Sequence, residues 1–340
     1  MRRSDKNIYP HANTIVTIED GKLLKKFQYE ILYNAKGLSA ALDELNAIDY
    51  FRTYKKAEPR NFRAMLDELM ADAFGLLREI APNDLVFRIF SLYYDIHNMK
   101  LAVKEKFFGK RFDDLALSYG SYSLATIRSA TVKKSDNILD DEILTEGLFE
   151  ALGAKEMYDI DFILDKTYFK TLKDIADKFD IPAMTGFAIA RIDLYNLSAF
   201  LQSLAAGAPK GYFAAAFSDE GSYAAEDCVE YVESMEMDPG NPEAMEKLFR
   251  EFPLWQRYSS IWEKTEEVAR IFFEFDVLCD NYLIEKTKAC KLMAFGIEPI
   301  CAYFYNKFME IKNIRILLAG KERRYKADEI KKRMRIPYEL

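Results

Sequence analysis

An acid-x-x-asparagine motif occurs three times in this sequence, and its repetition limits the folds open to the chain more than any other feature does. The copies are Asp95-Ile-His-Asn98, Asp193-Leu-Tyr-Asn196 and Glu310-Ile-Lys-Asn313. In each copy the acid precedes the amide by three residues, which places both side chains on one helical face. The asparagines are 98 and 117 residues apart. This long period predicts a fold built from three similar lobes.

Prolines and glycines flank the three copies in the same order. Pro82, Pro182 and Pro299 lie 16, 14 and 14 residues before their asparagines, where a proline suits the first turn of a helix. Glycines follow the asparagines and are expected to end the motif helices; they are Gly109, Gly207 and Gly320. We therefore interpret the repeated unit as a helical hairpin whose second helix carries the acid and the asparagine.

The length of 340 residues exceeds what one hydrophobic core usually accommodates, so two or three domains are expected. Half of the residues are hydrophobic, and the stretches between the 14 glycines and 10 prolines run long with a helical period. We predict an all-α protein with a first lobe and N-terminal helices at 1–130, a second lobe at 131–225, and a third lobe with a basic C-terminal end at 226–340.

The residues of the motif do not form a recognisable catalytic or metal site. A carboxylate-bridged metal site in a helical bundle uses Glu-x-x-His, whereas this motif offers a neutral amide in place of the imidazole. The sequence holds two histidines, and His97, inside the first copy, is replaced by Tyr195 and Lys312 in the others. No phosphate-binding loop or hydrolase motif is present. We expect no metal, cofactor or catalytic residue, and expect acid and amide to bond to a neighbouring helix or turn.

Two charged segments bear on partners. Residues 211–246 hold ten Asp or Glu and no Lys or Arg, whereas residues 321–335 hold eight Lys or Arg against three acids. The net charge of −7 and the lack of a known motif argue against nucleic acid. A solvated helix face explains the basic segment as well, but a docking role is the functional alternative, with candidates Lys331, Lys332, Arg333 and Arg335.

The hydropathy pattern predicts no transmembrane segment, because no uninterrupted apolar run reaches about 18 residues. The N-terminal residues lead into no apolar signal core. The four cysteines contain no close C-x-x-C pair and are expected to be free thiols of a reducing compartment. A cytoplasmic location is therefore expected.

The most specific stretches resemble a known family. They are Phe295-Gly-Ile-Glu-Pro-Ile, the run from Glu310 to Lys321, and Glu329-Ile-Lys-Lys-Arg-Met-Arg-Ile-Pro-Tyr. Together with Asp193-Leu-Tyr-Asn-Leu and Asp95-Ile-His-Asn-Met-Lys, they resemble the C subunit of the V-type (A/V-type) ATP synthase, which is the counterpart of the d subunit of the eukaryotic V-ATPase. The similarity extends over most of the chain from about residue 60 onward.

The resemblance implies a funnel-shaped, pseudo-threefold helical protein that performs no chemistry itself. It implies one copy per complex at the cytoplasmic face of the membrane, placed between the D and F subunits of the central shaft and the membrane proteolipid (c/K) ring. Torque would pass through it for H⁺ or Na⁺ transport. A free-standing helical-repeat scaffold and an uncharacterised carboxylate enzyme remain alternatives; the enzyme would require a deep pocket of converging acids with shifted pKa values.

Overall fold

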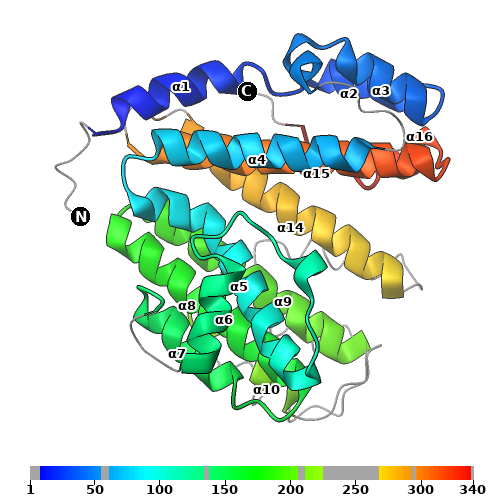
Figure 1. Ribbon diagram of the computed structural model, residues 1–340. Helices are drawn as coiled ribbons and strands as arrows, with labels where there is room; N and C mark the ends of the chain where they lie inside the picture. Colours follow the sequence, from blue (N-terminus) through cyan, green and yellow to red (C-terminus); the bar gives the residue numbers. More distant parts are fainter. Residues whose placement is uncertain are drawn as a thin grey trace. The chain divides into compact units, whose positions relative to one another are not determined.

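The computed structural model describes residues 8–54, 61–133, 138–205, 211–224, 268–291, 293 and 296–337. Throughout these residues the protein is helical and contains no strand, which confirms the all-α prediction (Figure 1). The helices are α1 (Pro10–Asp20), α2 (Lys26–Asn34), α3 (Leu38–Asn46), α4 (Phe62–Ile80), α5 (Asp84–Phe108), α6 (Leu124–Lys133), α7 (Glu142–Ala151), α8 (Met157–Phe179), α9 (Pro182–Ala205), α10 (Tyr212–Ala216), α14 (Val268–Lys291), α15 (Glu298–Glu322) and α16 (Ala327–Lys331). Short 3₁₀ turns span Asp49–Thr53 and Asp113–Leu115.

In each expected repeat two long helices follow one another, and the motif lies on the second helix each time. Helices α8 and α9 pack together as a hairpin, whereas α4 packs on α15 and belongs to a different compact unit from most of α5. Pro182 and Pro299 occupy the first and second residues of α9 and α15, as predicted. Pro82 instead precedes α5 by two residues, because Asn83 caps that helix by accepting a hydrogen bond from the Val86 N–H at 3.2 Å. Gly109 follows α5 directly and has φ +62°, which fits the predicted helix end.

Gly320 does not end its helix, so that prediction was wrong. Helix α15 continues to Glu322, and the chain turns at Arg324, whose φ is +59°. A Cβ atom at Gly320 would lie 2.7 Å from Ile330, which belongs to α16. The glycine therefore allows α16 to pack closely on α15. Gly207 lies outside the described residues.

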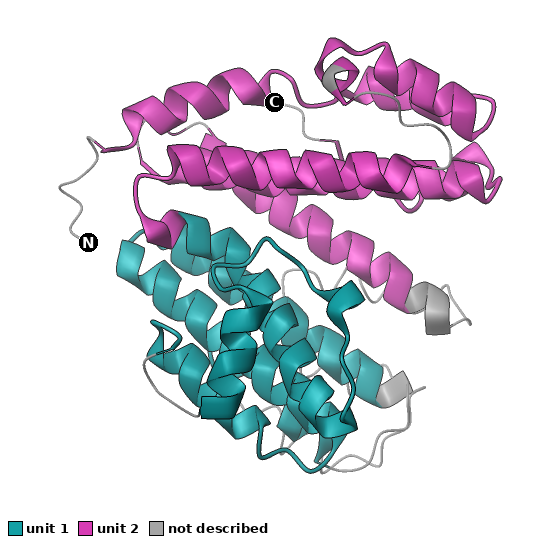
Figure 2. Ribbon diagram, viewed as in Figure 1, with its two compact units in different colours: residues 1–2, 87–268 teal, residues 3–86, 269–340 magenta. Residues whose placement is uncertain are grey.

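The chain divides into two compact units, residues 1–2 with 87–268 and residues 3–86 with 269–340 (Figure 2). The three-part division at residues 130 and 225 stays a prediction. Residues 225–267, at the second of these boundaries, and much of the acidic segment lie outside the described residues.

In the unit formed by the two ends of the chain, α15 is the central helix. Six consecutive residues, 300 to 305, are all buried, because α1, α3 and α4 pack on different sides of it. The apolar stripe of α4 joins that of α15 in one core with residues of α2 and α3. Helix α4 therefore packs against α15, which lies far away in sequence, and Phe74 stacks on Phe308 at 5.1 Å between ring centres.

In the other unit, α8 packs against α7, α9 and α10. Its buried residues recur every three or four positions, from Ile160 and Leu164 to Leu172 and Ile175, which is the pattern of a helix that buries one broad face. Lys100 and Lys104 of α5 pair with Asp165 and Asp161 of α8, each at 2.7 Å. Asp180, in the left-handed conformation, ends α8 just before α9 begins.

Candidate functional site

The three asparagines make the same pair of hydrogen bonds. Each side-chain amide donates through Nδ2 to the carbonyl of one later residue and accepts through Oδ1 from the N–H of that same residue. The partners are Leu117 for Asn98 (2.7 and 3.1 Å), Ser218 for Asn196 (2.9 and 2.8 Å) and Arg335 for Asn313 (3.2 and 2.9 Å). They lie 19, 22 and 22 residues after the asparagine. We call each such pair an asparagine clamp.

The clamp uses both functions of a primary amide, which explains the residue type. An aspartate could accept from the N–H but would place a second acceptor against the carbonyl, and a leucine would satisfy neither group. All three asparagines are almost fully buried, and the main-chain groups of the buried residues Ser218 and Arg335 would otherwise lack partners. The clamp holds an irregular segment of chain against the motif helix.

The acids of the first two copies bind the same loop as the clamp, five residues after Leu117 and four residues after Ser218. Asp95 accepts from the Tyr122 N–H at 2.9 Å, and Asp193 accepts from the Ser222 N–H at 2.7 Å. Both loops carry Gly-Ser at that place, with Gly120 and Gly221 against the acids. A Cβ atom at either glycine would lie 2.3 or 2.4 Å from the carboxylate oxygen, so a larger residue would displace it.

Burial governs the ionisation of these acids. It raises the pKa of Asp95 to about 6, although hydrogen bonds from Tyr122 and Ser121 oppose the shift. Burial likewise raises the pKa of Asp193, against bonds from Ser222. Both carboxylates accept hydrogen bonds from main-chain N–H groups. Burial also raises the pKa of Asp165, and the nearby Lys100 opposes that shift. Asp95, Asp193 and Asp165 each bond to a different partner within the protein, which fits a structural role.

The acid of the third copy binds a different part of the chain. Glu310 accepts from the Leu24 N–H at 2.6 Å, 286 residues earlier in sequence, and its other oxygen pairs with Lys307 at 2.5 Å. Both side chains of this pair are more than nine-tenths buried, and the Lys307 ammonium lies 4.2 Å above the ring of Tyr50. Sequence reasoning assigned Leu24 to the first lobe, whereas the contact fastens the α1–α2 connection to α15.

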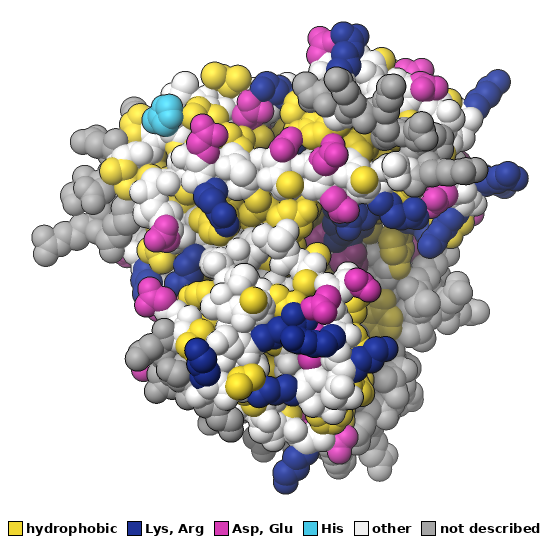
Figure 3. Space-filling view, viewed as in Figure 1, with side chains coloured by type: hydrophobic (Ala, Val, Ile, Leu, Met, Phe, Trp, Pro, Cys, Tyr) yellow, Lys and Arg dark blue, Asp and Glu magenta, His cyan; other side chains and the backbone are white. Residues whose placement is uncertain are grey.

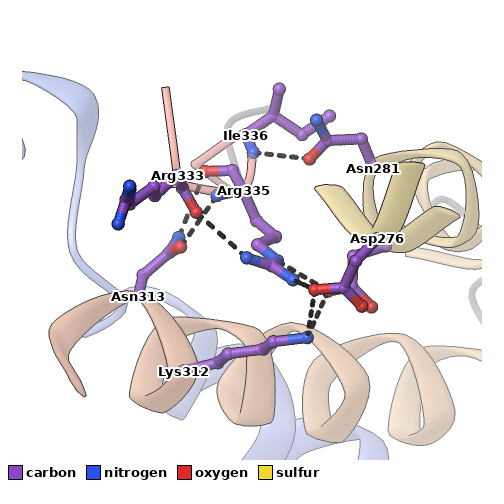
Figure 4. Close-up of polar contacts among 8 residues, drawn as sticks. Asp276, Asn281, Lys312, Asn313, Arg333, Arg335 and Ile336 are labelled. Carbon is purple, nitrogen blue, oxygen red and sulfur yellow. Dashed lines mark hydrogen bonds and ion pairs between the residues drawn. The ribbon is translucent and has the colours of Figure 1, made fainter. Parts of the chain in front are cut away.

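The third clamp is reinforced by the side chain of its own partner, Arg335 (Figure 4). The guanidinium bonds to Asp280 at 2.6 Å and to Asp276, both on α14, and donates to the Arg333 carbonyl at 3.0 Å. Lys312 pairs with Asp280 at 2.5 Å, and the Ile336 N–H donates to Asn281 at 2.8 Å. Residues 333–336 are thus fixed across α14 and α15.

The four residues predicted to dock a partner lie in different surroundings. Arg335 is only 2 % exposed and serves the network just described. The guanidinium of Arg333 stacks over Phe273 and Tyr325 at 5.2 and 4.9 Å. Lys331 and Lys332 are exposed, and Lys331 pairs with Glu30 of α2 at 2.8 Å. The exposed lysines therefore fit a docking surface better than the two arginines do.

Sequence reasoning missed the clamp partners, although a signal was present. In the first two repeats the clamped residue precedes the Gly-Ser pair by the same interval, as Leu117 precedes Gly120 and Ser218 precedes Gly221. Within the described residues, no three His, Cys, Asp or Glu side chains gather as a metal site would require. None of the described helices is both long and apolar enough to cross a bilayer.

Comparison with known proteins identifies relatives along the whole chain. Residues 12–333 match the family described as ATP synthase (C/AC39) subunit. The C subunit of the V-type sodium ATPase of Enterococcus hirae is 24 % identical, and the match covers 98 % of this chain and 99 % of that protein. The C subunit of the A-type ATP synthase of Methanocaldococcus jannaschii is 22 % identical over 95 % of this chain and 85 % of its own length.

Proposed function

The chain belongs to the ATP synthase (C/AC39) subunit family, the C subunits of the V/A-type rotary ATPases, and we propose that it is the socket of the central stalk. In this role it receives the D and F subunits of the shaft on one surface and rests on the membrane proteolipid ring with another. It passes torque between ATP turnover and H⁺ or Na⁺ transport, as one copy per complex at the cytoplasmic face of the membrane, without catalysing a reaction.

The match to the Enterococcus hirae protein over nearly the full length of both chains carries this proposal. The polar motif agrees with a non-catalytic role, because its acids and amides form hydrogen bonds with the chain's own main-chain groups. A socket that transmits torque must keep its loops fixed under load. The three clamps are also what three similar lobes would share, and the family leads us to propose that these lobes form a pseudo-threefold funnel.

Co-purification with the shaft and the ring tests the proposal. The chain is produced together with the D and F subunits and the proteolipids of the same organism, and complexes are isolated in mild detergent. We expect a complex with one copy of the chain. Complexes that lack it should hydrolyse ATP without moving ions, because the shaft then turns without driving the ring. A correctly folded chain that binds neither shaft nor ring would contradict the proposal.

The exposed lysines near α16 are proposed to contact an acidic partner surface in that complex. Replacing Lys331 and Lys332 by Glu reverses two exposed charges and breaks one surface ion pair, which costs at most about 1 kcal/mol of folding stability. We expect weaker assembly with an unchanged melting temperature. The control, Lys178→Glu, also breaks an exposed pair, with Asp174, and should assemble normally. Equal assembly of the double variant and the control would show that Lys331 and Lys332 belong to a solvated surface and contact no partner.

A further inference from the structure

A hollow of about 650 Å³ lies where α5 and α6 end, and its lining is strongly basic. Five cationic side chains line it against the single acid Glu105; they are Lys106, Lys110, Arg111, Arg128 and Lys133. Figure 3 shows Lys and Arg side chains gathered on this face of the molecule, over α5 and α6. The volume falls within the range of about 300–1,000 Å³ that is usual for small-ligand sites.

Three of these cations contact polar groups of the protein itself, among them the surface residue Arg111, which pairs with Glu105 at 3.5 Å. Arg128 donates to the buried Glu105 at 2.7 Å through Nε, and this bond lowers the pKa of Glu105 to about 2. Glu105 also accepts from the Phe112 N–H at 2.7 Å. Lys106 donates to the carbonyl of Thr131 near the end of α6, where the helix dipole favours a positive charge. These contacts fasten the loop after Gly109 to α6.

Three cations of the hollow, Lys110, Arg111 and Lys133, are exposed and are interleaved with exposed apolar side chains. Phe107, Phe108 and Val132 are 46 %, 53 % and 72 % exposed, and the side chain of Arg111 is 66 % exposed. Lys110 lies 5.8 Å above the ring of Phe112, which in turn packs edge-on against Phe108. We call Phe107, Phe108, Lys110, Arg111, Val132 and Lys133 the basic-aromatic patch.

We propose that the basic-aromatic patch binds anionic phospholipid headgroups at a membrane surface. The cations complement the phosphates, and each is worth about 5-fold in binding near an anionic bilayer. Aromatic rings suit the boundary between headgroups and acyl chains. Two of the three exposed cations are lysines, which are depleted in the cores of protein–protein interfaces, so lipid fits this composition better than an acidic protein does.

This contact goes beyond the proposed rotor function, whose partners are proteins. The proposed lipid contact involves the surface of one compact unit alone, so it can be tested separately from the binding of shaft and ring. The loop is held by the bonds of Glu105 to Arg128 and to the Phe112 N–H, while the pair of Glu105 with Arg111 is an ion pair at the surface, so replacing Arg111 should cost at most about 1 kcal/mol of folding stability.

Vesicle flotation with the full chain tests the proposal. Wild-type protein should float with phosphatidylcholine vesicles that contain phosphatidylglycerol, should remain behind with pure phosphatidylcholine, and should bind less as salt is added. Replacing Lys110 and Arg111 by Gln should lower the partition coefficient about 30-fold, since two surface charges are lost. Replacing Phe107 and Phe108 by Ser should lower binding at both low and high salt.

The matched control replaces two other exposed lysines of the same unit, Lys170 and Lys178, by Gln. It changes the net charge equally and should bind vesicles like wild type, and all variants should keep the wild-type melting temperature. An equal loss in the control would indicate diffuse charge attraction and overturn the proposal. Absence of wild-type binding to anionic vesicles would overturn it as well. If vesicle binding is absent and Lys110→Gln/Arg111→Gln fails to assemble with shaft or ring in detergent, the patch is a protein contact instead.

Discussion

Replacing Asn196 by Leu isolates the contribution of one asparagine clamp. The substitution removes both bonds to Ser218 and leaves a buried N–H and a buried carbonyl without partners, because Asn196 and Ser218 are each 2 % exposed. Two net hydrogen bonds contribute about 1 kcal/mol each, and an unsatisfied buried group costs about 1–3 kcal/mol. The added apolar surface of Leu offsets about 1–2 kcal/mol. The unfolding free energy should therefore fall by about 3 kcal/mol.

Urea denaturation followed by circular dichroism measures this change, and calorimetry should show the melting temperature lowered by roughly 6–12 °C. Gln202→Leu is the matched control, since it exchanges the same kinds of group on the same helix. Gln202 is exposed and bonds only weakly, to Ser198 at 3.1 Å, so this change should stay within about 0.5 kcal/mol.

The other two clamps make the test sharper. Asn313→Leu should cost about as much as Asn196→Leu, since its partner Arg335 is equally buried, whereas Asn98→Leu should cost less because Leu117 is only half-buried. If Asn196→Leu unfolds like wild type, the clamp does not hold the fold. If it is stable but no longer assembles with shaft or ring, the asparagine serves a partner contact instead.

Two further predictions concern the acids that sit beside the clamps. Gly221→Ala should destabilise the protein by about 1.5–3 kcal/mol in urea, because the new Cβ atom would push Asp193 away from the Ser222 N–H. Gly186→Ala, on the same helix as Asp193 and with open space around it, should instead stabilise by up to about 1 kcal/mol, and equal signs for the two variants would refute the steric argument. Asp95→Asn should remove a pH dependence. Because the folded-state pKa of Asp95 is raised to about 6, the folded protein binds more protons than the unfolded chain from about pH 4 to about pH 6, so wild-type stability falls by about 3 kcal/mol as pH rises through that window. Unfolding free energies with the same slope in both proteins would show that Asp95 is not the group responsible.

The sequence predicts the local structure well because proline, glycine and apolar spacing act over a few residues. Pro182 and Pro299 mark helix starts, and Gly109 marks a helix end. The same information does not say which helices pack together. The stripe on α4 fits any apolar surface, and its packing on α15 depends on the whole core that both ends of the chain build.

The candidate site shows the same limit. The spacing places acid and asparagine on one face, yet a main-chain partner carries no side-chain signature, so Leu117 and Arg335 cannot be recognised as clamp partners by residue type. The repetition could have indicated the clamp partners Leu117 and Ser218, because a Gly-Ser pair follows each of them at the same interval. The basic segment looked uniform in sequence, and only burial separates Arg335 from Lys331 and Lys332.

The departure of the third copy from the other two has a physical reason. Asp95 and Asp193 reach a loop that follows their own helix, so each is part of a local unit. Glu310 has one methylene more and bonds to Leu24, and its buried charge is balanced by Lys307 three residues before it. A buried ion pair of this kind costs several kcal/mol when one partner is removed, because the other charge is left uncompensated. A second buried lysine on the same helix, Lys321, donates to the Tyr33 and Ala35 carbonyls at the end of α2. The third repeat is therefore joined to the N-terminal helices by buried polar contacts as well as by the apolar core, which explains why residues 3–86 and 269–340 form one compact unit.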